Sequence, residues 1–515
     1  MSTAFEVYST RPEGGQDIQL WKTRKRTGRR KPWEVRWRVD TLPKSRSFLT
    51  SELAENYRSA LRAAARRGEY FSPVSGLPES WERATASMFS VVVDYARHAW
   101  AQTDSGNSRR TISDNLVRLA LAAVDDKAVK ATPAPGMPAQ LRSALLNWGL
   151  SFDVNPGAER AGDRVKPLTG VPEDAAACLA WVESVSRPVA DFGTETAALA
   201  LLDRACVKVR GSGRSAPATC RRRRGILSGL LTYAATRGLI NASPLKGVTI
   251  RRARSSDAVD RRVVPDWDQA GRLLCAVAES PNPRDRELAA FFTLAYLVGT
   301  RPGETRAVRE DDITWPEDIT DPDAVPGWGL LTVAGTATEV AAAYTDTGTK
   351  GETRGLKGRA DGDIRQVPVP PEGVAALRDH IATYGVAPDG RLFWYATPTD
   401  PHAVVPGKAY RRTWKRARKA ALTPAELRAG VAQRPYDLRH GAASYMIGDG
   451  VPTPEIARRL GHTVEVLMTV YVHWFKSQEN PANRLLEAAF RKRGPLTGQN
   501  PPPTANITRI TRSAA

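Results

Sequence analysis

Four residues in the second half of the chain have side chains suited to chemistry on an anionic substrate. They are Arg301, Arg439, His462 and Tyr471. A guanidinium group donates paired hydrogen bonds to oxyanions such as phosphate. Imidazole can donate or accept a hydrogen bond near neutral pH, and a tyrosine oxygen becomes a nucleophile when a base or a positive site activates it. Because the four residues are far apart in sequence, they form a site only if the fold brings them together.

The surrounding sequence contains patterns for the elements that would position these side chains. Arg301 follows a strongly apolar segment, which predicts a helix that ends in a turn. A β-pattern at residues 329–333 and a second at residues 364–369 predict the two strands of a hairpin. Lys357 precedes the returning strand and is expected near the tip of this hairpin. Lys350 lies farther from the returning strand, in a stretch that is expected to be a flexible insertion.

Together these segments resemble the signature of the tyrosine recombinases, or phage integrases. That signature is an Arg, a hairpin Lys, His-x-x-Arg, Gly-His and finally Tyr, and the elements occur here in that order. The phrases LKGRADGDIRQVPVPP (residues 356–371) and RPYDLRH (residues 434–440) are typical of integrases from integrative elements of high-GC bacteria. The resemblance covers about residues 17–490, although the first 250 residues match only in pattern.

The resemblance implies a mechanism of DNA cleavage and rejoining. Tyr471 would attack a phosphodiester, giving a 3′-phosphotyrosine and a free 5′-hydroxyl. Arg301 and Arg439 would neutralise the phosphate oxygens and stabilise the charge of the transition state. Lys357 would protonate the leaving 5′-oxygen, and His462 would donate a hydrogen bond to the phosphate. The phosphotyrosine would keep the energy of the cleaved phosphodiester bond, so rejoining is expected to need no ATP. Because two arginines and a lysine would neutralise the charge of the phosphate, no metal cofactor is expected either.

Two supporting positions are less clearly defined by the pattern. Glu304, one turn after Arg301, is expected to hold that arginine in place. Tyr436 stands where many family members have the His of His-x-x-Arg, which leaves the general base open. His440 and His473 are near in sequence and could take that role.

Each motif also has a plainer interpretation. Arg301 alone could be a surface residue at a helix end, and Tyr471 alone could be an ordinary packing residue. Residues 454–462 resemble the first half of a helix-turn-helix. Two rival functions therefore stay open: a type IB topoisomerase, which uses a similar residue set as a monomer, and a non-catalytic DNA-binding regulator. Five such elements in one order are improbable by chance, and the basic N-terminal module and the subgroup phrases argue against the topoisomerase.

The composition is consistent with a polyanionic partner. The 515 residues include 75 Lys and Arg against 55 Asp and Glu, for a formal net charge of +20, and basic surface attracts phosphate and releases its counterions. The four cysteines are scattered, the N-terminus has no signal-peptide pattern, and no apolar run is long enough to span a membrane. We therefore expect a cytoplasmic, nucleoid-associated protein of several domains.

The N-terminal region, residues 1–75, has alternating strand patterns followed by a helix pattern. Seven basic residues and no acid fill residues 22–31, with tryptophans before and after them. This combination favours DNA contact, and the resemblance implies binding to arm-type sites. The candidate contacts are Lys22, Arg24, Lys25 and Arg26.

Residues 76–250 have a helical pattern, which the resemblance identifies as a SAM-like core-binding domain. Its last helix, expected from about residue 216 to 238, has an apolar face and a run of arginines that suits phosphate contacts. The candidate contacts are Arg221, Arg222, Arg223 and Arg224.

The predicted fold class is α+β, mainly α. Residues 251–264 are expected to be a linker, residues 265–492 a mainly helical catalytic domain with a small β-sheet, and residues 493–515 a disordered tail. The partner implied by the resemblance is double-stranded DNA with attachment sites, bound by a homo-tetramer that host DNA-bending and directionality factors can assist. The task would be to integrate or excise a mobile element or prophage.

Overall fold

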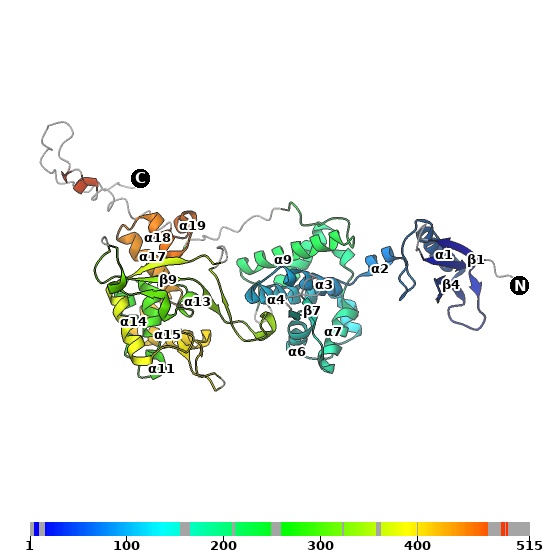
Figure 1. Ribbon diagram of the computed structural model, residues 1–515. Helices are drawn as coiled ribbons and strands as arrows, with labels where there is room; N and C mark the ends of the chain where they lie inside the picture. Colours follow the sequence, from blue (N-terminus) through cyan, green and yellow to red (C-terminus); the bar gives the residue numbers. More distant parts are fainter. Residues whose placement is uncertain are drawn as a thin grey trace, which may run out of the picture. The chain divides into compact units, whose positions relative to one another are not determined.

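The computed structural model describes residues 5–9, 16–154, 165–208, 212–248, 259–321, 324–356, 362–398, 400–471, 486–489 and 491–492. The chain forms two compact units (Figure 1). The first comprises Met1–Ala253 and Ala341–Thr349, and the second comprises Arg254–Val340 and Lys350–Ala515. The fold is mainly helical α+β, with a small antiparallel sheet near the N-terminus. The predicted C-terminal tail, residues 493–515, lies outside the described residues.

The N-terminal sheet of five strands is antiparallel throughout. Its strands are β1 (Phe5–Ser9), β2 (Asp17–Trp21), β3 (Arg24–Lys25), β4 (Trp33–Val39) and β5 (Leu42–Phe48). Alternate residues of β2 and β4 are buried, because successive side chains of a strand point to opposite faces. Helix α1 (Ser51–Arg66) packs on the sheet and contributes Ala54 and Leu61 to the same core. The predicted strands and helix of this region are confirmed.

The rest of the first unit is a helical region with one short hairpin. Its helices are α2 (Glu79–Thr85), α3 (Met88–Ala101), α4 (Gly106–Ala122), α5 (Asp126–Ala131), α6 (Pro138–Ala144), α7 (Glu173–Val185), α8 (Glu195–Cys206) and α9 (Pro217–Thr236), and the hairpin pairs β6 (Phe152–Val154) with β7 (Val165–Pro167). Helix α9 begins at a proline and is followed by Gly238 at a φ of 68°. These are typical start and stop signals of a helix, and the predicted bounds agree with the structure.

The segment Ala341–Thr349 belongs to the first unit although its neighbours in sequence belong to the second. Tyr344 is buried, and its ring centroid lies 5.5 Å from that of Trp100. Arg109, which is also buried, donates a hydrogen bond of 2.5 Å to Asp346. The prediction of a flexible insertion is therefore wrong for this segment, because its side chains are packed and ion-paired.

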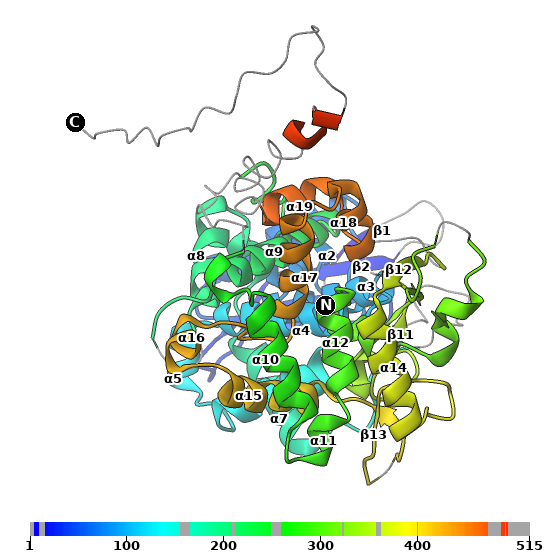
Figure 2. The ribbon, with the colours of Figure 1, turned by 90° about the vertical axis from the view of Figure 1, so that its left-hand side faces the viewer.

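The described residues of the second unit include helices α10 to α19 and several short sheets, and Figure 2 shows many of these elements turned by 90° from Figure 1. Its helices are α10 (Trp267–Ala278), α11 (Pro283–Arg286), α12 (Ala289–Leu297), α13 (Pro302–Thr305), α14 (Pro371–Tyr384), α15 (Gly407–Ala421), α16 (Pro424–Ala429), α17 (Asp437–Gly448), α18 (Thr453–Leu460) and α19 (Val464–Val470). Its strands are β8 (Ile313–Thr314), β9 (Gly329–Val333), β10 (Thr336–Thr338), β11 (Glu352–Arg354), β12 (Arg365–Val369), β13 (Trp394–Tyr395) and β14 (Ala403–Val404).

Helix α12 is the centre of the second unit. It is apolar on all sides and packs against α10, α14 and α17, as expected for a helix buried all round. Phe291 and Phe292 are fully buried in this core. Strands β9 and β12 pair antiparallel, with Val333 opposite Arg365. The predicted pairing of residues 329–333 with 364–369 is therefore confirmed, although a second pair, β10 with β11, lies between these strands in the chain.

No described helix is long and apolar enough to cross a membrane. Among the described residues, no group of three or more His, Cys, Asp and Glu side chains is arranged to hold a metal ion.

Candidate active site

The turn after α12 places Arg301. Gly299 has a φ of 74°, and a Cβ atom on it would lie 2.5 Å from Leu460 Cδ2, so this close approach requires a glycine. Arg301 then caps the one-turn helix α13, and its backbone N–H donates to Glu304 Oε2 at 2.8 Å. The break in the apolar helix therefore brings Arg301 and Glu304 to the packing surface of α18.

Glu304 is a buried carboxylate around which three arginines converge. Its side chain is 3% exposed and accepts hydrogen bonds from Arg301 Nη1 at 2.6 Å and Arg365 Nη2 at 2.8 Å. Arg439 Nη1 lies 3.9 Å from its Oε2. Burial raises the pKa of Glu304, but the arginines outweigh burial and lower the pKa to about 2. The carboxylate is therefore charged at neutral pH and fixes the arginines, as predicted for Arg301.

Arg439 is buried and fixed by backbone carbonyls. Its Nη1 donates to the carbonyl of Gly299 and its Nη2 to that of Leu460, while Nη2 also lies 3.1 Å from His462 Nε2. Burial is the main cause that lowers its pKa to about 10, so it stays protonated at neutral pH. Its Nε has no hydrogen-bond partner among the described residues. Such a donor is available to a bound anion.

Arg301 is the more accessible of the two predicted clamp residues. Its side chain is 26% exposed, and its Nη2 donates to the carbonyl of Gly461 at 3.2 Å. Burial lowers the pKa of Arg301, but Glu304 and Tyr436 outweigh burial and raise it above its ordinary value. The guanidinium is therefore permanently charged where solvent can reach it.

His462 follows the left-handed Gly461 that ends α18. Burial, together with Arg439 and Arg301, lowers the pKa of His462 to about 3, so the ring is neutral at neutral pH. Since Arg439 donates to Nε2, the proton of the neutral ring is assigned to Nδ1. This Nδ1 is buried and has no hydrogen-bond partner among the described residues, so it can donate to a phosphate oxygen.

Tyr471 stands at the end of α19 and is fully buried. Its hydroxyl lies 2.9 Å from Nδ1 of His440. Burial raises the pKa of Tyr471, and the nearby charges of Arg439 and Arg301 oppose that rise. The structure therefore brings the predicted tyrosine into the field of the predicted arginines.

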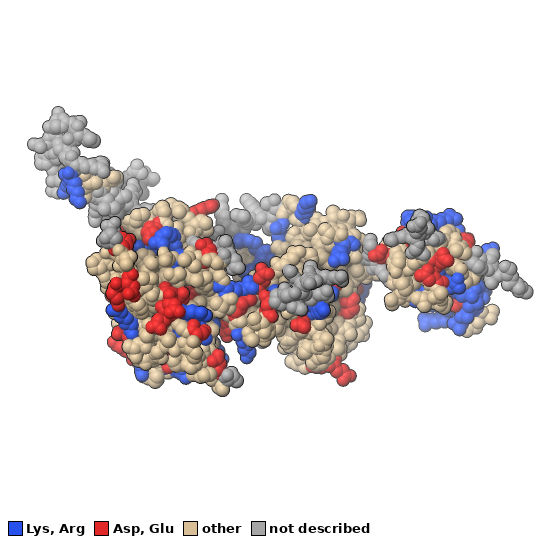
Figure 3. All heavy atoms as spheres, viewed as in Figure 1, with Lys and Arg blue, Asp and Glu red and all other residues tan. Residues whose placement is uncertain are grey.

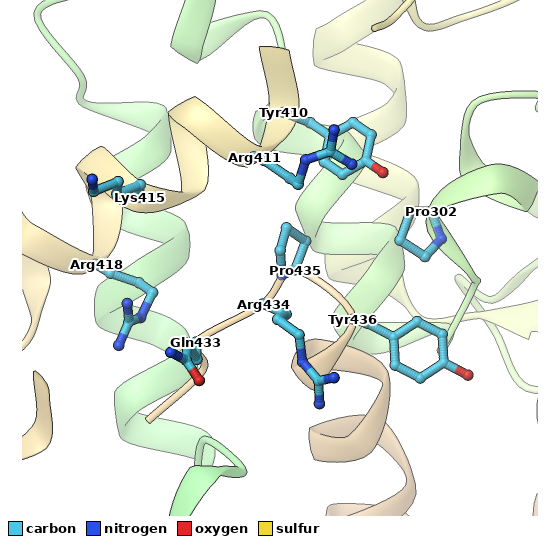
Figure 4. Close-up of a pocket in the computed structure, with 9 residues that line it drawn as sticks. All are labelled: Pro302, Tyr410, Arg411, Lys415, Arg418, Gln433, Arg434, Pro435 and Tyr436. Atoms are coloured by element: carbon cyan, nitrogen blue, oxygen red, sulfur yellow. The ribbon is translucent and has the colours of Figure 1, made fainter. Parts of the chain in front are cut away.

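Tyr436 lines a pocket of about 520 Å³ in the second unit (Figure 4). The residues that line it are Pro302, Tyr410, Arg411, Lys415, Arg418, Gln433, Arg434, Pro435 and Tyr436. Four of these are cationic and none is acidic. In Figure 4 the ring of Tyr436 lies below Pro302, which follows Arg301 in the chain. The pocket is thus a cationic hollow beside the arginine cluster.

The sequence reasoning missed this pocket and the role of Arg365. Arg411, Lys415 and Arg418 are spaced at i, i+4 and i+7 on α15, which places them on one face of the helix. That spacing was a usable signal. Arg365 has no comparable local signal, because it reaches Glu304 only through the pairing of β12 with β9.

Two predicted residues lie outside the described residues. They are Lys357, the predicted general acid, and His473, one of the two alternative bases. Lys350 is described and exposed. The predicted pairing of β9 with β12 is confirmed, whereas the role of Lys357 stays a prediction.

The predicted basic residues of the N-terminal sheet are partly paired with acid. The buried Glu34 accepts from Arg24 at 2.5 Å and from Arg26 at 3.2 Å. Lys25 lies over the ring of Trp33 at 5.9 Å, and Lys22 is exposed. Figure 3 shows Lys and Arg side chains over this part of the surface. The two arginines keep side-chain exposures of 40% and 37%, so all four cations can reach a ligand.

The four arginines of α9 do not form one basic face. Arg221 and Arg222 are exposed. Arg223 is buried and donates to the carbonyl of Ala205 at 2.5 Å, and Arg224 donates to the carbonyl of Val248. The prediction of DNA contact is therefore wrong for Arg223, which is used inside the unit, and is weakened for Arg224.

No family model matches the chain. The chain is 29% identical over 128 residues to a protein named as the prophage phiRv2 integrase of Mycobacterium tuberculosis, in strains CDC 1551 and H37Rv. The match covers 25% of this chain and 32% of the relative, so the chain aligns with about a third of that protein's length.

Similar solved structures include the Tn1549 transposon integrase in complex with a circular intermediate DNA, with a TM-score of 0.42 and 17% identity over 59% of this chain and 88% of that chain. They also include the XerH site-specific recombinase bound to a palindromic difH substrate, with a TM-score of 0.42 and 11% identity over 78% of this chain and 96% of that chain.

The sequence signature and the similarity to the prophage integrase agree with each other. Arg301, Arg439, His462 and Tyr471 occur in the order of the family signature. In the second unit Arg301 and Arg439 both lie near Glu304, and Arg439 contacts His462. The hydroxyl of Tyr471 contacts His440, which follows Arg439 in the chain. The signature and the similarity both point to the tyrosine recombinases, the family of the phage integrases, as the proteins that this chain resembles.

Proposed function

We propose that this protein is a site-specific DNA recombinase that cleaves and rejoins DNA through a 3′-phosphotyrosine at Tyr471. The observation that carries the proposal is the convergence of Arg301 and Arg439 on Glu304, with His462 in contact with Arg439. These residues come from three separate segments of the chain. A cluster of fixed positive donors beside a tyrosine is suited to an attack on a phosphodiester.

The arginines and His462 would bind the scissile phosphate. Arg439 Nε and His462 Nδ1 are donors without partners among the described residues, and Arg301 is accessible to solvent. Because Glu304 and the backbone carbonyls already hold these side chains, little reorganisation is needed when charge develops on the phosphate. The positive side chains supply the neutralisation that a metal ion supplies in other enzymes.

The cationic pocket supports a DNA substrate rather than a small phosphate ester. Arg411, Lys415 and Arg418 lie along one face of α15, beside the arginine cluster. A row of cations about one helical turn apart suits successive phosphates of a DNA backbone. We assign these three residues to phosphates that flank the scissile one.

The remaining roles follow the family. Lys357 would be the general acid that protonates the leaving 5′-oxygen. Residues 1–75 would bind arm-type sites, residues 76–250 the core site, and residues 265–492 would carry out the chemistry in a tetramer that joins two DNA sites. Integration or excision of a mobile element or prophage is the proposed task, and such a substrate places the protein with the nucleoid in the cytoplasm.

A covalent-trapping experiment tests the function. The attachment sites are read from the junctions of the mobile element that flanks the gene, and nicked duplexes of these sites serve as suicide substrates. We expect a protein–DNA adduct that resists denaturant, carries a free 5′-hydroxyl and forms in excess chelator. Binding without any adduct would mean a non-catalytic regulator.

A second measurement separates the recombinase from a type IB topoisomerase. Supercoiled plasmids with and without paired attachment sites are incubated with the protein. A recombinase exchanges strands only between paired sites, whereas relaxation of the plasmid without sites, at the same rate and with no recombinant product, would identify a topoisomerase.

A further inference from the structure

Helix α17 presents two aromatic side chains toward the predicted nucleophile. Tyr436 caps the helix and His440 lies four residues later, so both project from the same face, one turn apart. Their ring centroids are 5.2 Å apart in an edge-to-face arrangement. Tyr436 occupies the position at which many members of the family have a histidine, and the imidazole of this chain therefore stands one helical turn further on.

His440 is in direct contact with the reacting atom. Its Nδ1 lies 2.9 Å from the hydroxyl oxygen of Tyr471, and the two rings are 5.8 Å apart. A distance of 2.9 Å is within the range that proton transfer to a general base requires. Tyr471 is fully buried, so bulk solvent does not reach its hydroxyl in this conformation.

We propose that His440 is the general base that accepts the hydroxyl proton of Tyr471 during DNA cleavage, a role that rests on the function proposed above. As the bond from the tyrosine oxygen to phosphorus forms, the proton moves to His440 Nδ1. The bond from phosphorus to the 5′-oxygen breaks, and the leaving oxygen takes a proton from Lys357. In rejoining, the 5′-hydroxyl gives its proton to Lys357 and attacks phosphorus, and the departing tyrosine oxygen takes its proton back from His440.

The surroundings of the pair set the protonation states from which the transfer starts. Burial is the main cause that lowers the pKa of His440 to about 4; Arg434 and Arg439 add to the lowering, and Asp437 opposes it. The ring is therefore neutral and able to accept a proton at neutral pH. Burial raises the pKa of Tyr471, so the hydroxyl keeps its proton until a base removes it. Once protonated, the imidazolium would be stabilised by the carboxylate of Asp437.

The test compares cleavage rates of His440→Ala, His440→Asn and Tyr436→Phe on the suicide substrate, with DNA affinity measured in parallel. A general base contributes about 10²–10⁴-fold, so both His440 variants should lose cleavage by that factor. Asparagine keeps a hydrogen-bond partner for Tyr471 but cannot take a proton. Full activity of His440→Asn would therefore overturn the proposal in favour of a structural role. Tyr436→Phe keeps the ring and removes only the hydroxyl beside Arg301, so it should lose less activity than either His440 variant; an equal loss would count against His440 as the base.

Two further measurements distinguish loss of the general base from loss of the general acid and from a folding defect. A substrate with sulfur at the 5′-bridging position loses a thiolate that needs no proton, so it should restore Lys357→Ala and leave His440→Ala slow. Recovery of His440→Ala by added imidazole would support the proposal, and rescue of this variant by the sulfur substrate would contradict it. Absence of an adduct with the wild-type protein would instead count against the proposed function itself.

Discussion

Arginines are used in opposite ways in helix α9 and around Glu304. In α9 four arginines are adjacent in sequence, and the helix turns each about 100° from the next. Their side chains therefore diverge: Arg221 and Arg222 are exposed, while Arg223 and Arg224 bind carbonyls of their own unit. Around Glu304 three arginines from a turn, a strand and a helix meet at one carboxylate. The four consecutive arginines of α9 thus point in different directions, whereas tertiary packing brings together three arginines that are far apart in sequence.

The difference shows what makes a cationic site specific. The arginines around Glu304 are fixed by a buried acid before any substrate arrives, so they have a defined geometry. The exposed arginines of α9 have no such partner within the described contacts and would bind a backbone through charge alone. The predictions below test this contrast, from the largest expected effect to the smallest.

Glu304→Gln should be the most damaging substitution in the cluster. It leaves buried arginines without their counter-charge, which costs about 3–5 kcal/mol of unfolding free energy, and it should lower adduct formation by about 10²-fold or more. The matched control is Glu310→Gln, at an exposed acid of the same region. Equal stability of the two variants in urea unfolding would show that Glu304 does not organise the arginines.

The same pair of proteins gives a pH signature. The pKa of folded Glu304 is about 2, below its ordinary value of 4.5, so its contribution to stability is complete above about pH 4.5 and is lost as the pH falls toward 2. The difference in unfolding free energy between wild type and Glu304→Gln should shrink over that range. A difference that stays constant would contradict the depressed pKa.

Lys350 and Lys357 are close in sequence, but only Lys357 is expected to act in cleavage. Lys357→Ala should cleave ordinary DNA about 10²–10⁴-fold more slowly and cleave the sulfur-bridged substrate at nearly the wild-type rate. Lys350→Ala should match wild type on both. The reverse pattern would assign the general acid to Lys350.

The pocket face of α15 should contribute binding rather than chemistry. The double variant Arg411→Ser and Lys415→Ser removes two phosphate contacts, so the slope of log affinity against log salt should fall by about 1.8, at about 0.9 per contact. Arg412→Ser with Lys419→Ser removes the same charge from exposed positions of the same helix that do not line the pocket. Identical slopes for the two double variants would remove the pocket from the DNA interface.

The smallest effects are expected in α9. Arg221→Ser with Arg222→Ser should weaken DNA binding modestly and change stability by less than about 0.5 kcal/mol. Arg223→Ser should instead lower the unfolding free energy by about 1–3 kcal/mol, since it breaks a buried hydrogen bond to Ala205. If Arg223→Ser lowered DNA affinity at unchanged stability, its assignment to the interior would be wrong.

Local patterns predicted the parts of the fold that local physics determines. The alternation in β4, the bounds of α9 and the pairing of β9 with β12 all agree with the structure. The order of the family signature predicted the cluster of Arg301, Arg439 and His462.

Contacts between distant segments could not be predicted in this way. The packing of Tyr344 on Trp100 joins residues far apart in the chain, and the burial of Arg223 depends on a carbonyl of α8. Arg365 joins the cluster through strand pairing. His440 was one of two open alternatives, and only its position relative to Tyr471 distinguishes it.

The most direct test of the central claim is the identity of the tyrosine that becomes linked to DNA. Tyr471→Phe removes one oxygen and leaves the phosphate-binding arginines intact, so it should bind attachment-site DNA as tightly as wild type and form no adduct on a suicide substrate. Tyr436→Phe, at the other tyrosine beside the cluster, should form the adduct, and digestion of that adduct should release a DNA-linked peptide that contains Tyr471. An adduct formed by Tyr471→Phe would contradict the account.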